Sequence, residues 1–364
     1  MYTPTTITEL ATMVRTHDGP LTPVGAGLHQ ALGHAPVADA APVDLTGLTR
    51  VNDYIASDLT VTVEAGMTLG SLQDMLRVHR QWLPWDAPQH QRATIGGLLA
   101  AGLNGPLRHS AGTPRDWVLG MQFVTGDGRI IKSGGKVVKN VAGYDMHKLH
   151  IGALGTLGII AEVSFKVAPL PEADEIMRIT CAGIQHAHNT AYALRTPPYN
   201  PSALLIEATP HHIQLWGRWQ GVAGAVQRNL TMVRMRNRLA QETNLSAWEH
   251  LINQPFAHTY TQIRLGCAPQ RLPELYPILS QMTDHVSMHI LPTVGLVRIF
   301  HSQLPDLAAL RAAVAPLGGY VVVEVGTTAA RWGTAPANLA IMQRLKQTWD
   351  PADKLNRGRF IVTS

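Results

Sequence analysis

Glycine is concentrated in one part of this chain. Fourteen of the 32 glycines lie between His90 and Ile160. Glycine has no Cβ, adopts positive φ at little cost and lets backbone N–H groups approach a ligand closely. Several such loops in one domain predict a large phosphate-bearing ligand held mainly by main-chain groups. The loops lie in the segments ATIGGLLAAGLNG (93–105), RHSAGTPRDWVLGMQFVTGDGRIIKSGG (108–135), KNVAGYD (139–145) and GALGTLGIIAEV (152–163).

The composition suits a folded chain of two domains. With 364 residues, 45% of them hydrophobic, the chain is long enough for two well-filled cores. Its net charge is +5 and only 15% of the residues are charged. Because Lys and Arg form no run and aromatic residues are not interleaved with them, no nucleic-acid site is expected.

Cysteine and histidine usage predicts no metal site. An iron–sulfur cluster usually needs four thiolates, and the chain has only Cys181 and Cys267. One possible pair makes a disulfide framework improbable in so long a chain, so we predict two buried free thiols. The 17 histidines show no spacing typical of metal ligands.

The N-terminus carries no export signal. Residues 1–19 lack a basic region followed by an apolar core. Nowhere does the sequence contain a window of about 20 apolar residues, the length that a membrane-spanning helix needs. We therefore expect a cytoplasmic protein.

Helical and strand patterns alternate in the first part of the chain. Residues 5–16 predict a short helix, and residues 58–64 alternate apolar and polar side chains as a strand does. Thr68 is expected to cap a following helix. Residues 117–125 and 129–132 flank Gly126-Asp127-Gly128, which indicates a hairpin, and residues 156–167 predict a closing strand.

A Pro-rich, acidic break at 168–175 indicates a domain boundary. Two blocks after it repeat the order strand, helix, strand pair, helix, which predicts an antiparallel sheet covered by helices on one face. We expect domains at 1–168 and 176–345 and a C-terminal tail at 346–364. The predicted elements are 176–181, 185–195, 202–208, 213–218 and 223–239 in the first block, and 258–266, 269–282, 286–291, 295–300, 306–315 and 320–325 in the second.

Five motifs follow one another in the order of a known flavoprotein domain. They are PVGAGLH (23–29), ATIGG (93–97), RDWVLG (115–120), KNVAGYD (139–145) and GTLGII (155–160). In this order they resemble the FAD-binding domain of flavoproteins of the vanillyl-alcohol oxidase and p-cresol methylhydroxylase type. The chain is similar to the family of FAD-binding E subunits of bacterial glycolate oxidase (glycolate dehydrogenase). The resemblance implies an α+β fold, with a two-part FAD-binding domain, an antiparallel-sheet cap domain and a tail that returns toward the flavin.

The resemblance also implies which residues bind FAD. Backbone N–H groups of the first glycine loop would surround the diphosphate, and the Thr94 hydroxyl would donate to a phosphate oxygen. A positive side chain or hydroxyl near residue 108 would border the flavin ring and stabilise charge on the reduced cofactor. The implied cofactor-binding residues are Pro23, Val24, Gly25, Ala26, Gly27, Leu28, His29, Pro88, Ala93, Thr94, Ile95, Gly96, Gly97, Gly102, Asn104, Gly105, Arg108, His109, Thr113, Asp116, Gly155, Gly158, Ile159, Ile160 and Asn356.

Several motifs also have structural interpretations. The first loop alone could be a surface turn, and a nicotinamide Rossmann site is not predicted because the third glycine of that fingerprint is missing. Residues 93–105 could be a helix start packed by small residues. Arg115 and Asp116 could equally form an ion pair, and Asp145 is expected to cap a helix. Some relatives attach FAD through histidine, so His29 and His109 are candidates for such a bond, but noncovalent FAD is favoured.

The substrate-binding residues of the family cannot be recognised in this chain. Relatives grip a 2-hydroxy acid with Arg and His residues of the cap, where Arg264, Arg298 and Arg331 are available, but no matching constellation is recognisable. The resemblance implies a complex in which a homologous larger flavoprotein subunit oxidises glycolate to glyoxylate and an iron–sulfur subunit passes electrons toward quinone at the inner membrane face. The flavin of this chain would then relay electrons. The alternatives are a stand-alone FAD-dependent 2-hydroxy-acid dehydrogenase and a noncatalytic assembly subunit with a structural flavin.

Overall fold

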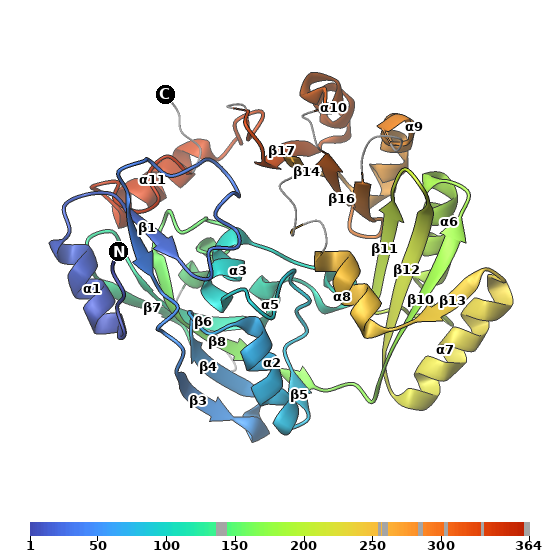
Figure 1. Cartoon of the computed structure of the whole chain (residues 1–364), viewed down its shortest axis with the longest axis horizontal. Helices are drawn as coiled ribbons and strands as arrows, with labels where there is room; N and C mark the ends of the chain where they lie inside the picture. The colour runs from blue at the N-terminus through green and yellow to red at the C-terminus, as the bar shows by residue number, and fades with distance from the viewer. Residues whose placement is uncertain are drawn as a thin grey trace. The chain divides into compact units, whose positions relative to one another are not determined.

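The computed structural model describes residues 1–135, 144–253, 256, 261–282, 287–301, 305–328 and 331–359 (Figure 1). The chain forms two compact units. Unit 1 comprises Met1–Asn104, Thr113–Leu170 and Thr334–Ser364, and unit 2 comprises Gly105–Gly112 and Pro171–Gly333. Two features differ from the division predicted from sequence. Residues 105–112 belong to unit 2, and the chain from residue 334 onward belongs to unit 1.

Unit 1 is built on a five-stranded antiparallel sheet. The strand order is β3 (Val51–Ile55), β4 (Thr60–Glu64), β8 (Ile159–Lys166), β6 (Val118–Val124) and β7 (Ile130–Gly134). The strands predicted at 58–64 and 156–167 are β4 and β8, which pair with each other. The predicted hairpin is formed by β6 and β7. Two small additions are the parallel pair β1 (Leu21–Val24) and β2 (Ala41–Asp44), and the pair β5 (Gln81–Trp82) and β9 (Ala168–Pro169).

Threonine side chains begin three helices of unit 1. Thr6 precedes α1 (Ile7–Thr16), Thr68 precedes α2 (Leu69–Val78), and Thr94 precedes α3 (Ile95–Ala101). In each case the hydroxyl accepts a hydrogen bond from a backbone N–H of the first turn, which has no partner inside the helix. The cap predicted at Thr68 is confirmed.

The C-terminal tail is fastened to unit 1 by one buried carboxylate. Asp350 follows α11 (Leu339–Trp349), is 1% exposed, and pairs with Lys346. Its two oxygens accept from the backbone N–H groups of Lys354 and Leu355 at 2.9 and 2.7 Å. Leu355 in turn forms a parallel bridge with Leu21 at the start of β1. The boundary predicted at 345 lies inside α11, which continues to Trp349. Asp350, the residue that holds the tail, comes only after the end of this helix.

Asp116 and Asp145 both lie at the start of short helices, but their carboxylates accept hydrogen bonds from different groups. The carboxylate of Asp116 accepts from the backbone N–H and the hydroxyl of Thr113 at 2.7 and 3.0 Å, which begins α5 (Pro114–Trp117). It therefore serves as part of a cap, not as the ion-pair partner of Arg115. Asp145 was expected to be a cap, but its side chain bonds no helix N–H and instead accepts from Lys148 Nζ at 2.7 Å. That expectation is wrong because the lysine one turn later captures the carboxylate.

Unit 2 is built on an eight-stranded sheet in which every neighbouring pair is antiparallel. The two repeated blocks meet in its middle, where β11 pairs with β15 and Ile206 lies opposite Ile290. The sheet thus joins two similar halves. The strand order is β13 (Ala240–Thr243), β10 (Ala173–Cys181), β12 (Ile213–Gly221), β11 (Ala203–Ala208), β15 (Ser287–Leu291), β16 (Leu296–His301), β14 (Thr261–Gly266) and β17 (Tyr320–Val325).

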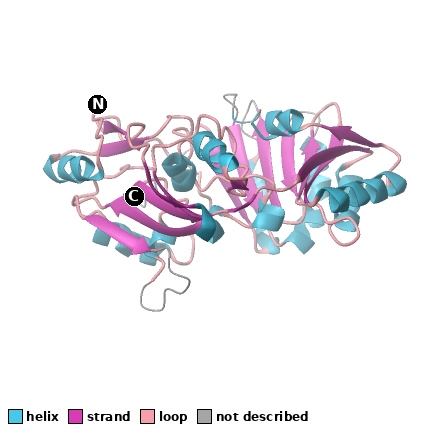
Figure 2. Ribbon diagram, turned by 90° about the horizontal axis from the view of Figure 1, so that it is seen from below, coloured by secondary structure: helices cyan, strands magenta, loops and turns pink. Residues whose placement is uncertain are grey.

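Helices cover one face of this sheet, as Figure 2 shows. The helices are α6 (Ile184–Leu194), α7 (Ala223–Arg236), α9 (Tyr276–Met282) and α10 (Leu307–Val314). Their apolar side chains form one core with the strands, in which Leu230, Leu279 and Val314 are 2% exposed or less. The opposite face also carries cover. Trp248 of α8 (Leu245–Asn253), an element that was not predicted, is fully buried beneath the guanidinium of Arg218.

Both cysteines are free, with Cys181 buried and Cys267 half-buried. In the described part of the chain, no helix is long and apolar enough to cross a membrane.

Candidate functional site

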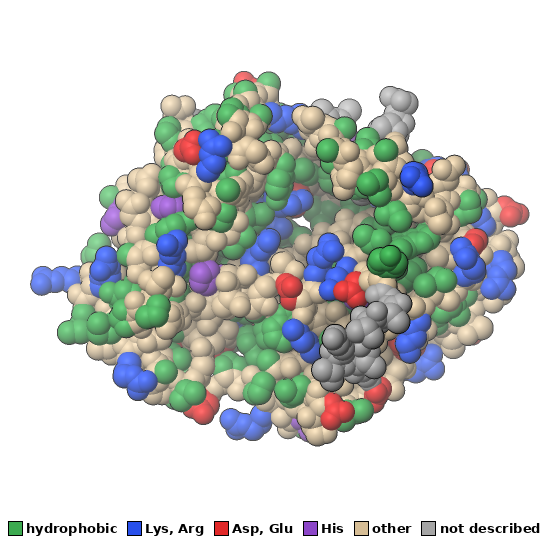
Figure 3. Space-filling view, turned by 180° about the vertical axis from the view of Figure 1, so that it is seen from behind, with side chains coloured by type: hydrophobic (Ala, Val, Ile, Leu, Met, Phe, Trp, Pro, Cys, Tyr) green, Lys and Arg blue, Asp and Glu red, His purple; other side chains and the backbone are tan. Residues whose placement is uncertain are grey.

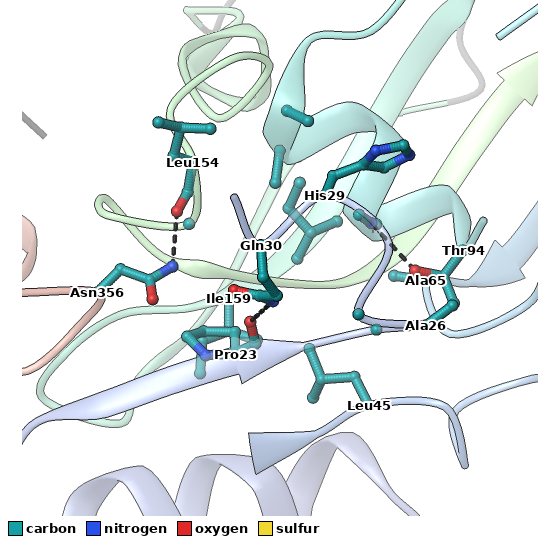
Figure 4. Close-up of a pocket in the computed structure, with 18 of the residues that line it drawn as sticks. Pro23, Ala26, His29, Gln30, Leu45, Ala65, Thr94, Leu154, Ile159 and Asn356 are labelled. Carbon is teal, nitrogen blue, oxygen red and sulfur yellow. Dashed lines mark hydrogen bonds between the residues drawn. The ribbon is translucent and has the colours of Figure 1, made fainter. Parts of the chain in front are cut away.

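Unit 1 contains a pocket of about 740 Å³, shown in Figure 4. This volume includes solvent at the open mouth of the pocket. Three glycine-rich segments and the C-terminal tail supply its walls. The lining residues are Pro23, Gly25, Ala26, Gly27, Leu28, His29, Gln30, Leu45, Ala65, Ala93, Thr94, Gly96, Gly97, Ala100, Ala101, Leu154, Gly155, Gly158, Ile159, Ile160, Asn356 and Arg359.

The first glycine loop offers backbone donors to this pocket. It starts where β1 ends, and Gly27 adopts φ +73°, a conformation that disfavours other residues. The N–H groups of residues 25–28 donate to no group among the described residues. Consecutive N–H groups that make no hydrogen bond within the protein suit a diphosphate, because a diphosphate supplies several acceptor oxygens.

Gly25 allows this loop to lie against α3. A Cβ placed on Gly25 would come within 2.1 Å of Thr94 Oγ1, so any side chain would force the two segments apart. The Thr94 hydroxyl already accepts from Gly97 N at 3.3 Å, which leaves its own hydrogen to donate elsewhere. The geometry is compatible with the predicted donation from Thr94 to a phosphate oxygen.

Gly96 and Gly97 of α3 line the pocket, and their own N–H groups are already paired. The N–H of Gly96 donates to Ala65 O at 2.8 Å, and that of Gly97 to the Thr94 hydroxyl, so neither is an unspent donor. A Cβ on Gly96 would come within 3.0 Å of the Ala65 side chain. Their small size therefore serves helix packing at the pocket wall. The interpretation of this segment as a helix start packed by small residues describes both glycines well.

The tail closes the pocket beside the last glycine loop. Asn356 Nδ2 donates to Leu154 O at 2.6 Å, and Gly155 leaves room for this amide, since a Cβ there would lie 2.9 Å from Nδ2. Asn356 Oδ1 is buried and has no hydrogen-bond partner among the described residues. A buried amide oxygen needs a donor, and a ligand hydroxyl or amine would supply one.

Arg359 is a lining residue that the sequence analysis did not select. It is 3% exposed, and its guanidinium donates to Gln30 Oε1 and Leu32 O, both at 2.6 Å. Gln30 also connects to the first loop by donating to Pro23 O at 3.4 Å. The described lining contains no Asp or Glu, so Arg359 makes the pocket electropositive. It lies three residues after Asn356, the predicted cofactor-binding residue of the tail.

The pocket brings together 15 of the predicted cofactor-binding residues, namely Pro23, Gly25, Ala26, Gly27, Leu28, His29, Ala93, Thr94, Gly96, Gly97, Gly155, Gly158, Ile159, Ile160 and Asn356. The others do not line it. Val24, Pro88, Ile95, Gly102, Asn104, Thr113 and Asp116 lie elsewhere in unit 1, and Gly105, Arg108 and His109 lie in unit 2. Residues 139–143 of the KNVAGYD motif lie outside the described residues.

Unit 2 contains a second polar site, around Glu324 of β17. Arg264 of β14 and Arg298 of β16 are register partners. Their Nε atoms donate to the two oxygens of Glu324 at 2.6 and 3.2 Å. Arg264 also donates to the Tyr320 hydroxyl at 2.9 Å. We call these four residues and Arg108 the arginine cluster. The sequence analysis named Arg264 and Arg298 as separate candidates. The participation of Glu324 and Tyr320 follows only from the pairing of β17 with β14.

The segment that unit 2 takes from the first half of the chain carries Arg108. Within this unit, His109 Nδ1 lies 2.7 Å from Thr293 Oγ1, and Ser110 Oγ donates to Ser202 O at 2.8 Å. Burial lowers the pKa of Arg108 below its usual value; the Tyr320 hydroxyl acts in the opposite direction, and the guanidiniums of Arg298 and Arg264 lower the pKa further. The backbone N–H of Arg108 donates to Gly105 O at 3.3 Å, but its side chain makes no hydrogen bond or ion pair with the described residues.

Charge in the arginine cluster is positive and mostly buried. The side chains of Glu324 and Arg298 are 11% and 12% exposed. Burial would raise the pKa of Glu324, but Arg298 and Arg264 hold it below its usual value, so the carboxylate stays ionised. Burial lowers the pKa of His289, the register partner of Arg298, to about 3, so this imidazole is neutral at physiological pH. Two guanidiniums share the single carboxylate of Glu324, so the cluster carries an excess of positive charge that can attract a small anion. Arg331 is different, since it donates to the backbone oxygens of Glu324 and Gly326.

Metal ligands do not gather in either unit. No group of three or more His, Cys, Asp or Glu that could hold an ion occurs among the described residues.

Known proteins resemble the chain in sequence and in fold. The profile of a family described as "FAD binding domain" matches residues 1–134. Glycolate oxidase subunit GlcE of Escherichia coli K12 is 30% identical over 313 residues, which are 85% of this chain and 83% of that protein. Glycolate oxidase subunit GlcD of Bacillus subtilis 168 is 28% identical over 198 residues, 54% of this chain and 42% of that protein. A solved structure of alkyldihydroxyacetonephosphate synthase shares the fold with a TM-score of 0.69 and 18% identity, covering 98% of this chain and 76% of that one.

These matches agree with the pocket. The family profile ends in β7 and so covers two of the three glycine-rich segments that line it. The unspent amides of the first loop, the Thr94 hydroxyl, the unpartnered oxygen of Asn356 and the cation of Arg359 all suit a dinucleotide with a diphosphate. The chain belongs to the family of the glycolate oxidase subunit GlcE, and its cofactor is FAD.

Proposed function

We propose that this chain is the FAD-binding subunit of a glycolate oxidase complex, which oxidises glycolate to glyoxylate and passes electrons toward quinone. The observation that carries the proposal is the match with GlcE, which extends over 313 residues and thus includes both units. GlcD, a second relative, is named as another subunit of glycolate oxidase, so the relatives indicate a complex of several subunits. Only two cysteines are present, so an iron–sulfur centre for the onward path would belong to a further subunit.

The residues of unit 1 would hold FAD by its diphosphate and by main-chain groups. Bound FAD supplies a ring that accepts the two electrons released when a CH–OH group becomes C=O. In the proposal the N–H groups of residues 25–28, the Thr94 hydroxyl and Arg359 bind the diphosphate, and Asn356 Oδ1 accepts from a hydroxyl or amine of the cofactor.

We infer that the arginine cluster recognises the carboxylate of the 2-hydroxy acid. The guanidiniums of Arg264 and Arg298 donate to the carboxylate of Glu324. The guanidinium of Arg108 makes no such bond with the described residues and is therefore available to a ligand. This inference changes one sequence-based expectation. A flavin that only relays electrons was expected because no clamp for a 2-hydroxy acid was recognisable, and Arg264 and Arg298 do come together in the fold. Recognition of the acid by this chain would allow direct oxidation, the chemistry of the stand-alone alternative.

The test follows flavin absorbance after anaerobic mixing of the FAD-loaded chain with glycolate, D-lactate or L-lactate. We expect saturable bleaching by glycolate with the isolated chain, because the cluster supplies cations for its carboxylate. Turnover with a quinone analogue should need the partner subunits, because the chain lacks its own iron–sulfur path. Absence of bleaching by all three acids would favour the relay. Rapid turnover of one acid with quinone by the chain alone would favour the stand-alone enzyme.

FAD is proposed to bind without a covalent bond. His29 lines the pocket, so a histidyl link is a specific alternative. We expect acid precipitation to release all flavin into the supernatant, because main-chain donors and Arg359 hold the cofactor by hydrogen bonds alone. Yellow colour that remains in the washed pellet of the wild type but not of His29→Ala would establish the histidyl link instead.

A further inference from the structure

Helix α7 carries apolar side chains on two opposite sides. Val226, Leu230 and Val233 are buried against the sheet of unit 2. The outward side bears Met232 and Met235, and Leu239 follows just beyond the helix end. Met235 is 76% exposed and Leu239 is 64% exposed. The spacing of three residues places Met232 and Met235 on the same side of the helix, and Leu239 follows in the turn after the helix end. We call Met232, Met235 and Leu239 the outer stripe.

Four arginines lie close to the outer stripe in the sequence, and fewer carboxylates than arginines accompany them. Arg228, Arg234, Arg236 and Arg238 lie on or just after α7, and the sequence contains no Asp or Glu between Glu207 and Glu242. Glu242 pairs with Arg234, and Arg236 lies over the ring of Tyr199. Arg228 and Arg238 have no ion pair with the described residues. On the face of the molecule that Figure 3 shows, basic and acidic side chains are interspersed among apolar ones.

This combination is typical of a protein interface. Met and Arg are enriched in the buried parts of protein interfaces, whereas Lys, Asp and Glu are depleted there. The outer stripe includes two methionines, and arginines border it. An isolated exposed apolar residue needs no explanation, but a line of them beside a buried line on the same helix does.

We propose that the outer stripe of α7 binds a partner protein that presents an apolar surface bordered by carboxylates, and that this partner is the larger flavoprotein subunit of the complex. The choice of partner rests on the proposed function. A second copy of this chain fits poorly, because a symmetric contact through α7 would bring the same arginines together. An anionic membrane fits less well, because the border has no lysine and the stripe has no aromatic residue, the residues usual at such surfaces.

The experiment measures binding of the full FAD-loaded chain to the larger flavoprotein subunit of the same cell, produced separately, by calorimetry. Met232→Ser/Met235→Ser should weaken binding about 100-fold, since each buried anchor contributes roughly a factor of ten. Arg228→Glu/Arg238→Glu should weaken it at least as much. Val78→Ser, at a residue of α2 that is 79% exposed, is the matched control and should change affinity less than twofold. Flavin content and circular dichroism must stay at wild-type values.

Each outcome decides between specific alternatives. Equal affinity of the stripe variants and the wild type would overturn the interface while leaving the proposed function intact. Failure of the wild type to bind the flavoprotein subunit would contradict both the complex and the named partner. A wild-type dimer in light scattering that Met232→Ser/Met235→Ser dissociates would assign the stripe to a second copy. Sedimentation of the wild type, but not of the arginine variant, with phosphatidylglycerol vesicles would assign it to a membrane.

Discussion

Replacement of Arg359 by glutamine is expected to weaken FAD binding about 10- to 100-fold. A hydrogen bond to a charged group contributes about 1.5–3 kcal/mol, and each 1.4 kcal/mol is a factor of ten in affinity. Arg359 is buried at a pocket whose described lining has no acidic residue, so its charge acts on the diphosphate with little screening by water. The measurement is a titration of the apoprotein with FAD followed by flavin fluorescence.

The same tail provides a matched control. Arg357 donates to the backbone oxygens of Asp353 and Ala352 and pairs with the Asp353 carboxylate, all within its own turn. Arg357→Gln should therefore leave FAD affinity nearly unchanged. Arg359→Lys should fall between glutamine and the wild type, because it keeps the charge and loses the planar fork.

A competition experiment separates charge from structure. ADP carries the diphosphate without the flavin, so Arg359→Gln should weaken ADP and FAD by similar factors. If affinity for FAD falls while affinity for ADP does not, Arg359 acts on another part of the cofactor. If Arg357→Gln and Arg359→Gln weaken FAD equally, the tail as a whole supports the pocket and the specific role of Arg359 is wrong.

Local signals in the sequence predicted most elements of the fold. Thr68 marks the start of α2, and Asp306, which accepts from Ala308 N and Ala309 N, marks that of α10. Caps and strand alternation depend on neighbouring residues only, so one sequence reveals them. The short strand β13 and the helix α8 were missed. Trp248 of α8 packs beneath the guanidinium of Arg218, which lies about 30 residues earlier in the chain. A pattern of neighbouring residues cannot predict such a contact.

The candidate sites separate local from distant information in the same way. Glycine loops are recognisable because glycine is chosen for its own backbone, as at Gly27. Arg359 looks like any arginine near a C-terminus, and its burial depends on Gln30 and Leu32, more than 300 residues away in the sequence. The assignment of residues 105–112 to unit 2 likewise depends on contacts of His109 and Ser110 with distant residues.

Loss of Arg298 is expected to destabilise unit 2 by about 3–5 kcal/mol, the usual cost of removing one partner of a buried ion pair. Arg298→Gln leaves the buried Glu324 with Arg264 as its only charged partner among the described residues. Urea unfolding at pH 7 measures the change in the free energy of unfolding. Arg331→Gln is the control and should cost about 1–3 kcal/mol at most, because Arg331 donates to backbone oxygens and not to the carboxylate.

Arg108→Gln distinguishes a structural role of the arginine cluster from a binding role. The side chain of Arg108 makes no hydrogen bond or ion pair with the described residues, so stability should change little, whereas affinity for oxalate and glycolate should fall about tenfold in calorimetry. Oxalate is the appropriate probe because it presents carboxylates and cannot be oxidised in the same way as a 2-hydroxy acid. Unchanged oxalate binding in Arg108→Gln, combined with the predicted instability of Arg298→Gln, would make the cluster a fold-stabilising network. The positive charge would then serve Glu324 alone, and the flavin would again be best explained as an electron relay.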